Sequence, residues 1–267
     1  MVWVGGVGWE RRNLASVPQV RDQAICVRQW DWSETSQTVS LFARELGVIR
    51  AVAKGAKREK ASFSGGLEVA TRGEMLAIVK AGDTLANLTS WDLQEIFPAL
   101  RRKLGVFYAG MYLLDLVQQS IRDQDPHPAL FDALLEALRA CEAGQERARA
   151  GVLWFQWRTL AETGVAPDLE RAVGGESVVG FSARSGGVVP APREAEAGVQ
   201  RVRAETIAAL RGVSRSAGPG GLEVSAESLR RASGLLAWYV RESLGVESAA
   251  AEMYLRTLRP EGIEGPR

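Results

Sequence analysis

Histidine is almost absent from this sequence, which has one, His127, among 267 residues. A Ser-His-Asp triad and an HExxH zinc site both need histidine beside partner residues, and neither can be assembled around the DPHP turn that holds His127. Also missing are a GxxxxGKS/T phosphate loop and a GxSxG nucleophile turn, while GGVGWE near the start follows no strand. We therefore predict that the chain is not an enzyme.

Cysteine is scarce as well. Cys26 and Cys141 lie far apart, without a CxxC pair or a secretory signal, which is typical of reduced core thiols rather than of a disulfide framework. No apolar run approaches the ~18 residues of a membrane span, and the N-terminal residues lack the order of a signal peptide. We expect a cytoplasmic protein.

The chain also lacks an excess of charge of either sign. Its formal net charge of +1 excludes a uniformly basic coat for nucleic acid, so a polyanion site would require local segregation of charge. With 46% hydrophobic and 24% charged residues, the composition is that of a globular protein. The length favours two packed domains, or one domain with extensions.

The first part of the chain alternates as β-strands do. Residues 1–20 show no clear period, and we expect a disordered N-terminal extension there. From Ala24 onward, turn-prone residues separate five β-like segments: AICVRQWDW, TVSLFARE, GVIRAVAKG, LEVATRGEMLAIVKAG and DTLANLTSWDLQEIF. Five segments this close together predict a small closed barrel.

Beyond Pro98 the hydrophobic period becomes helical, so the fold class is α+β. The spacing predicts one helix from about Leu100 to Ile121, a second starting at Asp125 and Pro126, a third over about 146–163, and later helices over 203–213, 225–245 and 249–258. Between them, residues 172–200 are rich in glycine and small side chains and hold at most two short strands. We predict a hairpin insert.

Positive charge gathers around the third β segment. From Arg44 to Lys60 there are six cations and two glutamates, a local charge of +4. Alternation places Arg50 and Lys54 on one face, with Ile49, Ala51 and Ala53 on the other. Such a basic surface beside Trp30, Trp32 and Phe63 suits single-stranded nucleic acid. Two alternatives to a nucleic-acid surface remain open. In one, the cations only solvate the edge of a sheet, and in the other, the aromatic residues belong to the core.

The same region resembles the bacterial RecO recombination mediators. The run WDWSETSQTVSLFARELGVIRAVAKGAKREKASFSGGLEVA is similar to the family's strand, turn, strand and "VAKGARxxKSRF" pattern. The similarity continues through LTSWDLQEIFPALRRKLGVFYAGMYLLDLV and LAETGVAPDLERA, so that it covers about residues 21–172, and it thins beyond them.

One departure from the family concerns zinc. Many relatives place four zinc-binding cysteines around the hairpin, but the corresponding positions here are Ala172, Gly175, Pro190 and Arg193, none of which binds zinc. We therefore expect no metal and no other cofactor.

The resemblance implies an N-terminal five-stranded OB-fold barrel followed by a helical domain with a small hairpin insert that lacks zinc ligands. The expected divisions are an extension over 1–20, the OB-fold domain over 21–97, a first helical part over 98–171, a degenerate zinc-ribbon-like hairpin over 172–202 and a second helical part over 203–260. The implied activity is non-catalytic: the protein binds single- and double-stranded DNA at the nucleoid, anneals complementary strands, and with RecR and often RecF helps RecA to replace single-strand-binding protein.

Annealing requires neutralisation of two backbones without recognition of base sequence, which suits lysine and arginine. We predict DNA contacts foremost from Arg50, Lys54, Lys57, Arg58 and Lys60, and also from Arg28, Arg44 and Arg72. Arg101, Arg102 and Lys103 lie where the barrel meets the first helix. They either continue the line of DNA-contacting cations or belong to a solvated helix start.

The acidic, hydrophobic tail of single-strand-binding protein would dock, by resemblance, on the helical domain. The candidates are Arg230, Arg231, Leu235, Trp238, Tyr239 and Arg241. The helical spacing of the apolar candidates is equally consistent with buried core positions. The alternative function is a scaffold for RecR and single-strand-binding protein with weak or no DNA binding; a hydrolase or transferase is a distant third.

Overall fold

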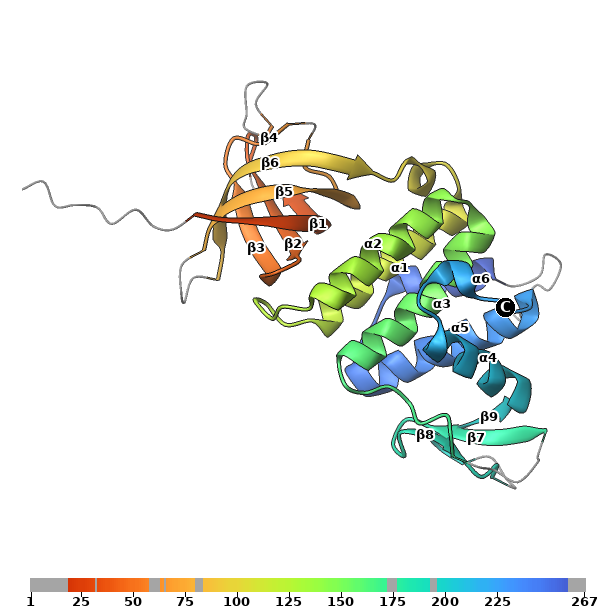
Figure 1. The fold of residues 1–267 in the computed structure, drawn as a ribbon. Coiled ribbons are helices and arrows are strands. Elements are labelled where there is room, and N and C mark those ends of the chain that lie inside the picture. The colour runs from red at the N-terminus through yellow and green to blue at the C-terminus, as the bar shows by residue number, and fades with distance from the viewer. Residues whose placement is uncertain are drawn as a thin grey trace, which may run out of the picture.

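A computed structural model describes residues 19–31, 33–57, 63–64, 66–79, 84–171, 177–192 and 196–258. A strand-rich N-terminal domain lies at one end of the molecule, the helices lie in the middle, and a small second sheet lies at the far end (Figure 1). The expected extension over 1–20 lies outside the described residues, except for Gln19 and Val20, which begin the first strand.

The first domain is an OB-like sheet. Its strands are β1 (Gln19–Asp31), β2 (Gln37–Ala43), β3 (Gly47–Ala53), β4 (Phe63–Ser64), β5 (Thr71–Ile78) and β6 (Ala86–Ile96). The five long strands run in the order β3-β2-β1-β5-β6, and β3 then pairs with β6 in parallel over three residue pairs. The prediction of a closed barrel was therefore wrong: β3 and β6 meet over only these three residue pairs, so the domain is an OB-like sheet.

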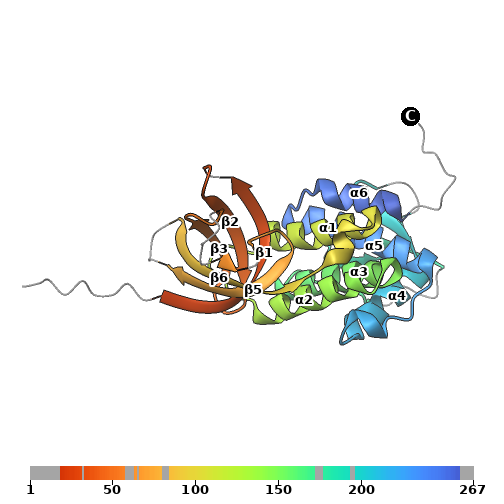
Figure 2. The same ribbon diagram turned by 90° about the horizontal axis from the view of Figure 1, so that it is seen from above.

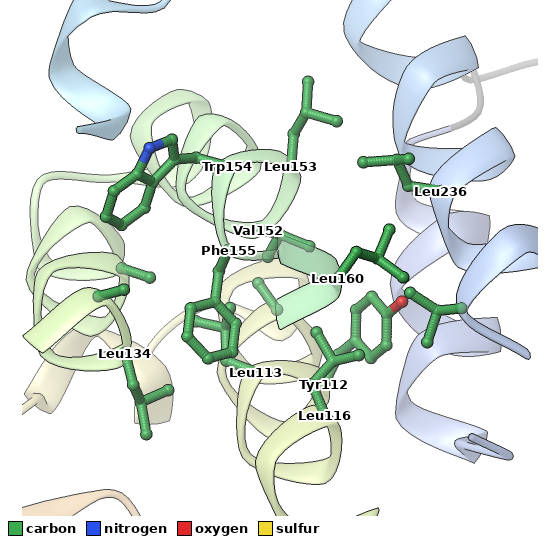
Figure 3. Packing of buried hydrophobic residues seen from close by; sticks show 14 of the residues in the cluster. Tyr112, Leu113, Leu116, Leu134, Val152, Leu153, Trp154, Phe155, Leu160 and Leu236 are labelled. Atoms are coloured by element: carbon green, nitrogen blue, oxygen red, sulfur yellow. The ribbon is translucent and has the colours of Figure 1, made fainter. Parts of the chain in front are cut away.

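The helices match the predicted periodicity. A short 3-10 helix, η1 (Pro98–Arg101), leads into α1 (Leu104–Ser120), and the other helices are α2 (Pro128–Glu142), α3 (Gln145–Glu162), α4 (Ala204–Arg215), α5 (Ala226–Leu244) and α6 (Ala249–Thr257), with a further 3-10 turn, η2 (Pro219–Gly221). The second helix begins at Pro128, later than predicted. In Figure 3, side chains of α1, α2 and α5 surround α3, whose Val152, Phe155 and Leu160 are fully buried.

The insert has one strand more than predicted. The strands β7 (Val178–Ser182) and β8 (Gly187–Val189) form the expected hairpin, and β9 (Val199–Arg203) pairs with the other edge of β7. Phe181 of β7 packs edge-on against Tyr239 of α5, with ring centroids 5.4 Å apart. Packing on α5 therefore helps to hold this sheet.

Two hydrophobic cores support the fold. One fills the OB-like domain and includes Leu41, Met75 and Trp91. The other continues from the helices onto the outer side of the sheet, where the ring centroids of Phe42 in β2 and Phe131 in α2 are 5.8 Å apart. Both views show the helical domain directly beside the strands (Figures 1 and 2).

A glycine lets the loop after α1 close on the sheet. Gly47 has φ +73°, and a Cβ there would lie 2.2 Å from the carbonyl oxygen of Asp125. In the same loop, the Gln124 N–H donates to the Val48 carbonyl at 2.8 Å. The two domains are thus joined through backbone as well as side chains.

Candidate nucleic-acid interface

The outer face of β1, β2 and β3, called here the β1–β3 face, carries two exposed arginines in one row. Arg28 lies opposite Ser40, and Ser40 lies opposite Arg50. Directly opposed residues in antiparallel strands share a face of the sheet. Arg28 and Arg50 are exposed, whereas Ile49 and Ala51 are buried, as the predicted alternation requires.

A β-bulge places Arg28 on this face. The pairing with β2 shifts between Cys26, which faces the domain core, and Arg28. Strict alternation would put Arg28 on the same side as Cys26, and the extra residue of the bulge reverses that. The Arg28 guanidinium then lies 5.1 Å from the ring centroid of Trp30, whose side chain is 39% exposed. The result is a cation stacked on an accessible aromatic ring.

The turn after β3 adds lysines beside this face. Lys54 is exposed and forms no ion pair with any residue that the structure describes. The ammonium of Lys57 lies 2.6 Å from an oxygen of Asp31, and the Lys57 N–H donates to the Thr35 carbonyl. This turn therefore packs against the turn between β1 and β2. The candidates Arg58 and Lys60 lie outside the described residues.

Three other candidate cations are held in ion pairs. Arg44 contacts Asp132 of α2 at 2.8 Å, Arg50 contacts Asp123 after α1 at 3.2 Å, and Arg72 contacts Glu95 at 3.0 Å. Glu95 also accepts two hydrogen bonds from Arg139 of α2, and these neighbours lower the pKa of Glu95. The first two arginines thus bind the sheet directly to the helical domain, and Arg72 does so through Glu95.

Of the aromatics expected beside the cations, Trp30 alone lies accessible among the described residues. Phe63 is in the core of the OB-like domain, and Trp32 lies outside the described residues. At the domain junction, Arg101 pairs with Glu68, while Arg102 and Lys103 are exposed and form no ion pair within the described part of the chain.

The residues expected to receive a peptide tail separate into two groups. A hollow of about 370 Å³ between β9 and α5 is lined by Arg231, Leu235 and Trp238, together with Arg201 and Arg203 of β9. Arg230 and Arg241 do not line it: Arg230 pairs with Glu227, and Arg241 with Glu242. Tyr239 is buried against Phe181. Sequence reasoning missed Arg201 and Arg203, and the alternation in VQRVR was the available signal for them.

Within the described residues, no three metal-ligating side chains gather. Pro190 ends the β8 side of the hairpin, and the other three positions compared with zinc ligands lie outside the described residues. The described helices include none that is both long and apolar enough to cross a membrane.

Two family sequence models match the chain. The one described as "Recombination protein O N terminal" matches residues 17–97, and the one described as "Recombination protein O C terminal" matches residues 101–249, more than half of the chain. The chain belongs to the RecO family. Its members take part in DNA repair and recombination, and the boundary between the two matches falls at η1, where the sheet gives way to helices.

Curated relatives bear the same description. The chain is 34% identical over 178 residues to the DNA repair protein RecO of Salinibacter ruber. The matched segment is 64% of this chain and 67% of that protein. It is 36% identical over 148 residues to the DNA repair protein RecO of Rhodopirellula baltica. That match covers 55% of this chain and 54% of the relative. It is 31% identical over 176 residues to the DNA repair protein RecO of Anaeromyxobacter sp. strain K. That match covers 64% of this chain and 69% of the relative. A role in DNA repair follows from this membership.

Proposed function

We propose that the protein acts without catalysis at the nucleoid, where it binds single- and double-stranded DNA and anneals complementary strands. The observation that carries the proposal is the stack of Arg28 on the accessible Trp30, beside Arg50 and the turn that holds Lys54 and Lys57. Cations next to an exposed aromatic ring suit a flexible strand, because phosphates meet positive charge while a base stacks.

The cations differ in how freely they can meet phosphate. Lys54 is exposed without an ion pair to a described residue, so its charge is available at once. Lys57 and Arg50 have exposed aspartate partners that a phosphate can replace at little cost, since exposed ion pairs contribute about 0–1 kcal/mol. Arg44 and Arg72 are more firmly engaged by Asp132 and Glu95. We place the DNA path over Arg28, Trp30, Arg50, Lys54 and Lys57, with Arg58 and Lys60 continuing it.

Charge neutralisation without base-specific contacts explains annealing, because two strands repel until their phosphates are screened. With RecR, and with RecF where present, the protein would then help RecA to load onto DNA covered by single-strand-binding protein. The hollow between β9 and α5 is where we place the acidic, hydrophobic tail of that protein. Arg201, Arg203 and Arg231 line it beside Leu235 and Trp238, and Arg231 is also paired with Glu227 at 2.6 Å.

The test is anisotropy of a labelled single-stranded oligonucleotide across a salt series. Contact with about four phosphates gives a log-log slope of about −3, and changing Lys54, Lys57, Arg58 and Lys60 together to alanine should flatten it by about 2 or more. A Trp30→Ala variant should weaken binding with little change of slope, because a neutral ring releases no counterions. An unchanged slope in the fourfold variant would move the DNA path elsewhere.

A second candidate, a scaffold for RecR and single-strand-binding protein, rests on the ion pairs. Asp123, Asp132 and Glu95 compensate Arg50, Arg44 and Arg72, which leaves less free positive charge than the sequence suggests. Absence of DNA binding at low salt, with retained binding of RecR, would favour this scaffold.

A further inference from the structure

A hollow of about 700 Å³ lies where the OB-like domain meets the first helix. Phe97 and Leu100 line it beside η1, and Phe107 and Met111 line it from α1. Gly110 lets η1 pack closely here, since a Cβ on it would lie 2.2 Å from a methyl carbon of Leu100. The domain junction therefore builds the hollow, whose volume falls within the range of about 300–1,000 Å³ that ligand pockets have.

The hollow and the β1–β3 face lie on the two sides of one strand, β1. Gln29 of β1 lines the hollow and pairs with Val39, which belongs to the core of the OB-like domain. Its chain neighbours Arg28 and Trp30 point the other way, because successive side chains of a strand alternate between the two faces of a sheet. A ligand in the hollow would thus lie close to a DNA strand on the β1–β3 face, with β1 between them.

Each side of β1 has one accessible aromatic ring. Among the described residues, Trp30 and Phe107 are the two aromatic side chains that are exposed, at 39% and 40%. The ring of Tyr108 packs edge-on against Phe107, with centroids 5.4 Å apart, which helps to fix the position of Phe107. An exposed and positioned ring is a platform on which any base can stack.

Positive charge borders the same hollow. Arg101, Arg102 and Lys103 are consecutive and exposed, and Arg101 pairs with Glu68, the one carboxylate of the described residues that line the hollow. The α1 helix starts without a side-chain cap, and its first turn holds no acidic residue. Its free N–H groups and the positive end of its dipole therefore join the cations in favouring a phosphate.

We propose that this hollow binds an unstacked base of a second DNA single strand, with the base on the Phe107 ring and a phosphate at Arg102, Lys103 and the start of α1. The Gln29 amide offers donors and an acceptor, so it can meet the edge of any base. Annealing requires two strands to come together, and β1 would hold one on each side. This inference rests on the proposed function, since it takes the β1–β3 face as the site of the first strand.

The experiment uses the full chain and a single-stranded oligonucleotide in which 5-iodouracil replaces thymine. On irradiation, this base forms a crosslink to an aromatic side chain on which it stacks. Trypsin separates the two sites, because Trp30 lies in the peptide over 29–44 and Phe107 in the peptide over 104–122. Mass spectrometry should find crosslinks in both peptides.

Phe107→Leu keeps the apolar bulk but removes the ring. It should remove the crosslink from 104–122, leave that in 29–44, and slow the annealing of complementary strands about tenfold, the scale of one lost stack. Arg102→Ala should slow annealing as well, whereas Phe107→Tyr keeps the ring and should anneal as wild type does. Both Phe107 and Arg102 are exposed, so these variants should keep the wild-type melting temperature. The control for charge is Arg122→Ala, which removes an exposed cation from the loop after α1 and should leave annealing unchanged.

The crosslinks separate this inference from the proposed function. Crosslinks in 29–44 alone would overturn the inference and leave the proposed DNA path in place. Crosslinks in 104–122 alone would overturn that path and keep the hollow as a DNA site, and crosslinks in neither peptide would overturn both. Annealing by F107L at the wild-type rate would also overturn the inference, and would assign the hollow to an apolar protein segment, for which leucine can replace phenylalanine.

Discussion

Arg139 of α2 donates two hydrogen bonds to the carboxylate of Glu95 in β6, both at 2.8 Å. Glu95 also accepts a hydrogen bond from Arg72. One carboxylate therefore connects two strands of the sheet to the helical domain, and its two arginines lower its pKa from the usual 4.5.

Glu95→Gln should lower the free energy of unfolding at pH 7 by about 1.5–3 kcal/mol, the range for hydrogen bonds to a charged group. The pKa of Glu95 is lower in the folded state than its ordinary value of 4.5. The stabilisation by the ionised carboxylate is therefore fully present above pH 4.5 and is lost as the pH falls through the folded-state pKa. Denaturant unfolding at pH 7, 5, 4 and 3 should show the two proteins converging.

The matched control is Asp92→Asn, an exposed carboxylate on the same strand that forms no ion pair with a described residue. It should change stability little at any of these pH values. A difference between wild type and E95Q that does not depend on pH would contradict the role of the charge.

Gly47→Ala should destabilise the protein by about 2–4 kcal/mol, because it adds a clash with the Asp125 backbone to the cost of a positive φ. Gly245→Ala provides the control: φ is +68°, but no atom lies within 4 Å of the added Cβ, so about 1 kcal/mol is expected. Equal losses in the two variants, measured by urea unfolding, would mean that the loop after α1 moves away easily.

Both cysteines should resist thiol reagents in the folded protein. Cys26 and Cys141 are fully buried, and burial raises the pKa of each thiol to about 12. With the thiolate suppressed and access blocked, labelling by DTNB at pH 8 should be slow. Two thiols per chain should react after guanidinium is added. Rapid labelling without denaturant would reveal local opening of a core.

Purified protein should carry well under one equivalent of zinc, and EDTA should leave its melting temperature unchanged. By the resemblance, Pro190 and Arg193 would correspond to cysteine ligands of many relatives, and neither side chain binds zinc. Side chains of β7 pack the small sheet against α5. Elemental analysis decides this prediction; a stoichiometric ion that survives dialysis would show that other residues bind it.

Periodicity predicted the long strands and helices because burial on one side governs both. The alternation of Arg50 against Ile49 and Ala51 was confirmed for the same reason, whereas Lys54 lies in the turn after β3 and not on the strand. The bulge after Cys26 was not predicted, since a single extra residue is invisible without the partner strand. Nor was β9 predicted, because the insert, rich in glycine and small residues, was expected to hold at most two short strands.

The ion pairs were beyond sequence reasoning for another reason. Arg44 and Asp132 are separated by 88 positions, and their contact depends on how the sheet packs on α2. The sequence pattern shows that Arg44 brings a positive charge to this region. It does not show which carboxylate pairs with that charge. The hollow at η1 likewise exists only once β6 and α1 have been placed.

The contact between Phe42 and Phe131 implies that the strands and helices melt together. Ile25, Val27, Phe42 and Val48 belong to the sheet, yet they are buried in the same core as α1, α2 and α3. Cutting the chain at η1 would expose this apolar surface to water, so an isolated N-terminal fragment should self-associate. Calorimetry of the whole chain should therefore show one cooperative transition, and partial unfolding that frees strands β1, β2 and β3 alone should be rare.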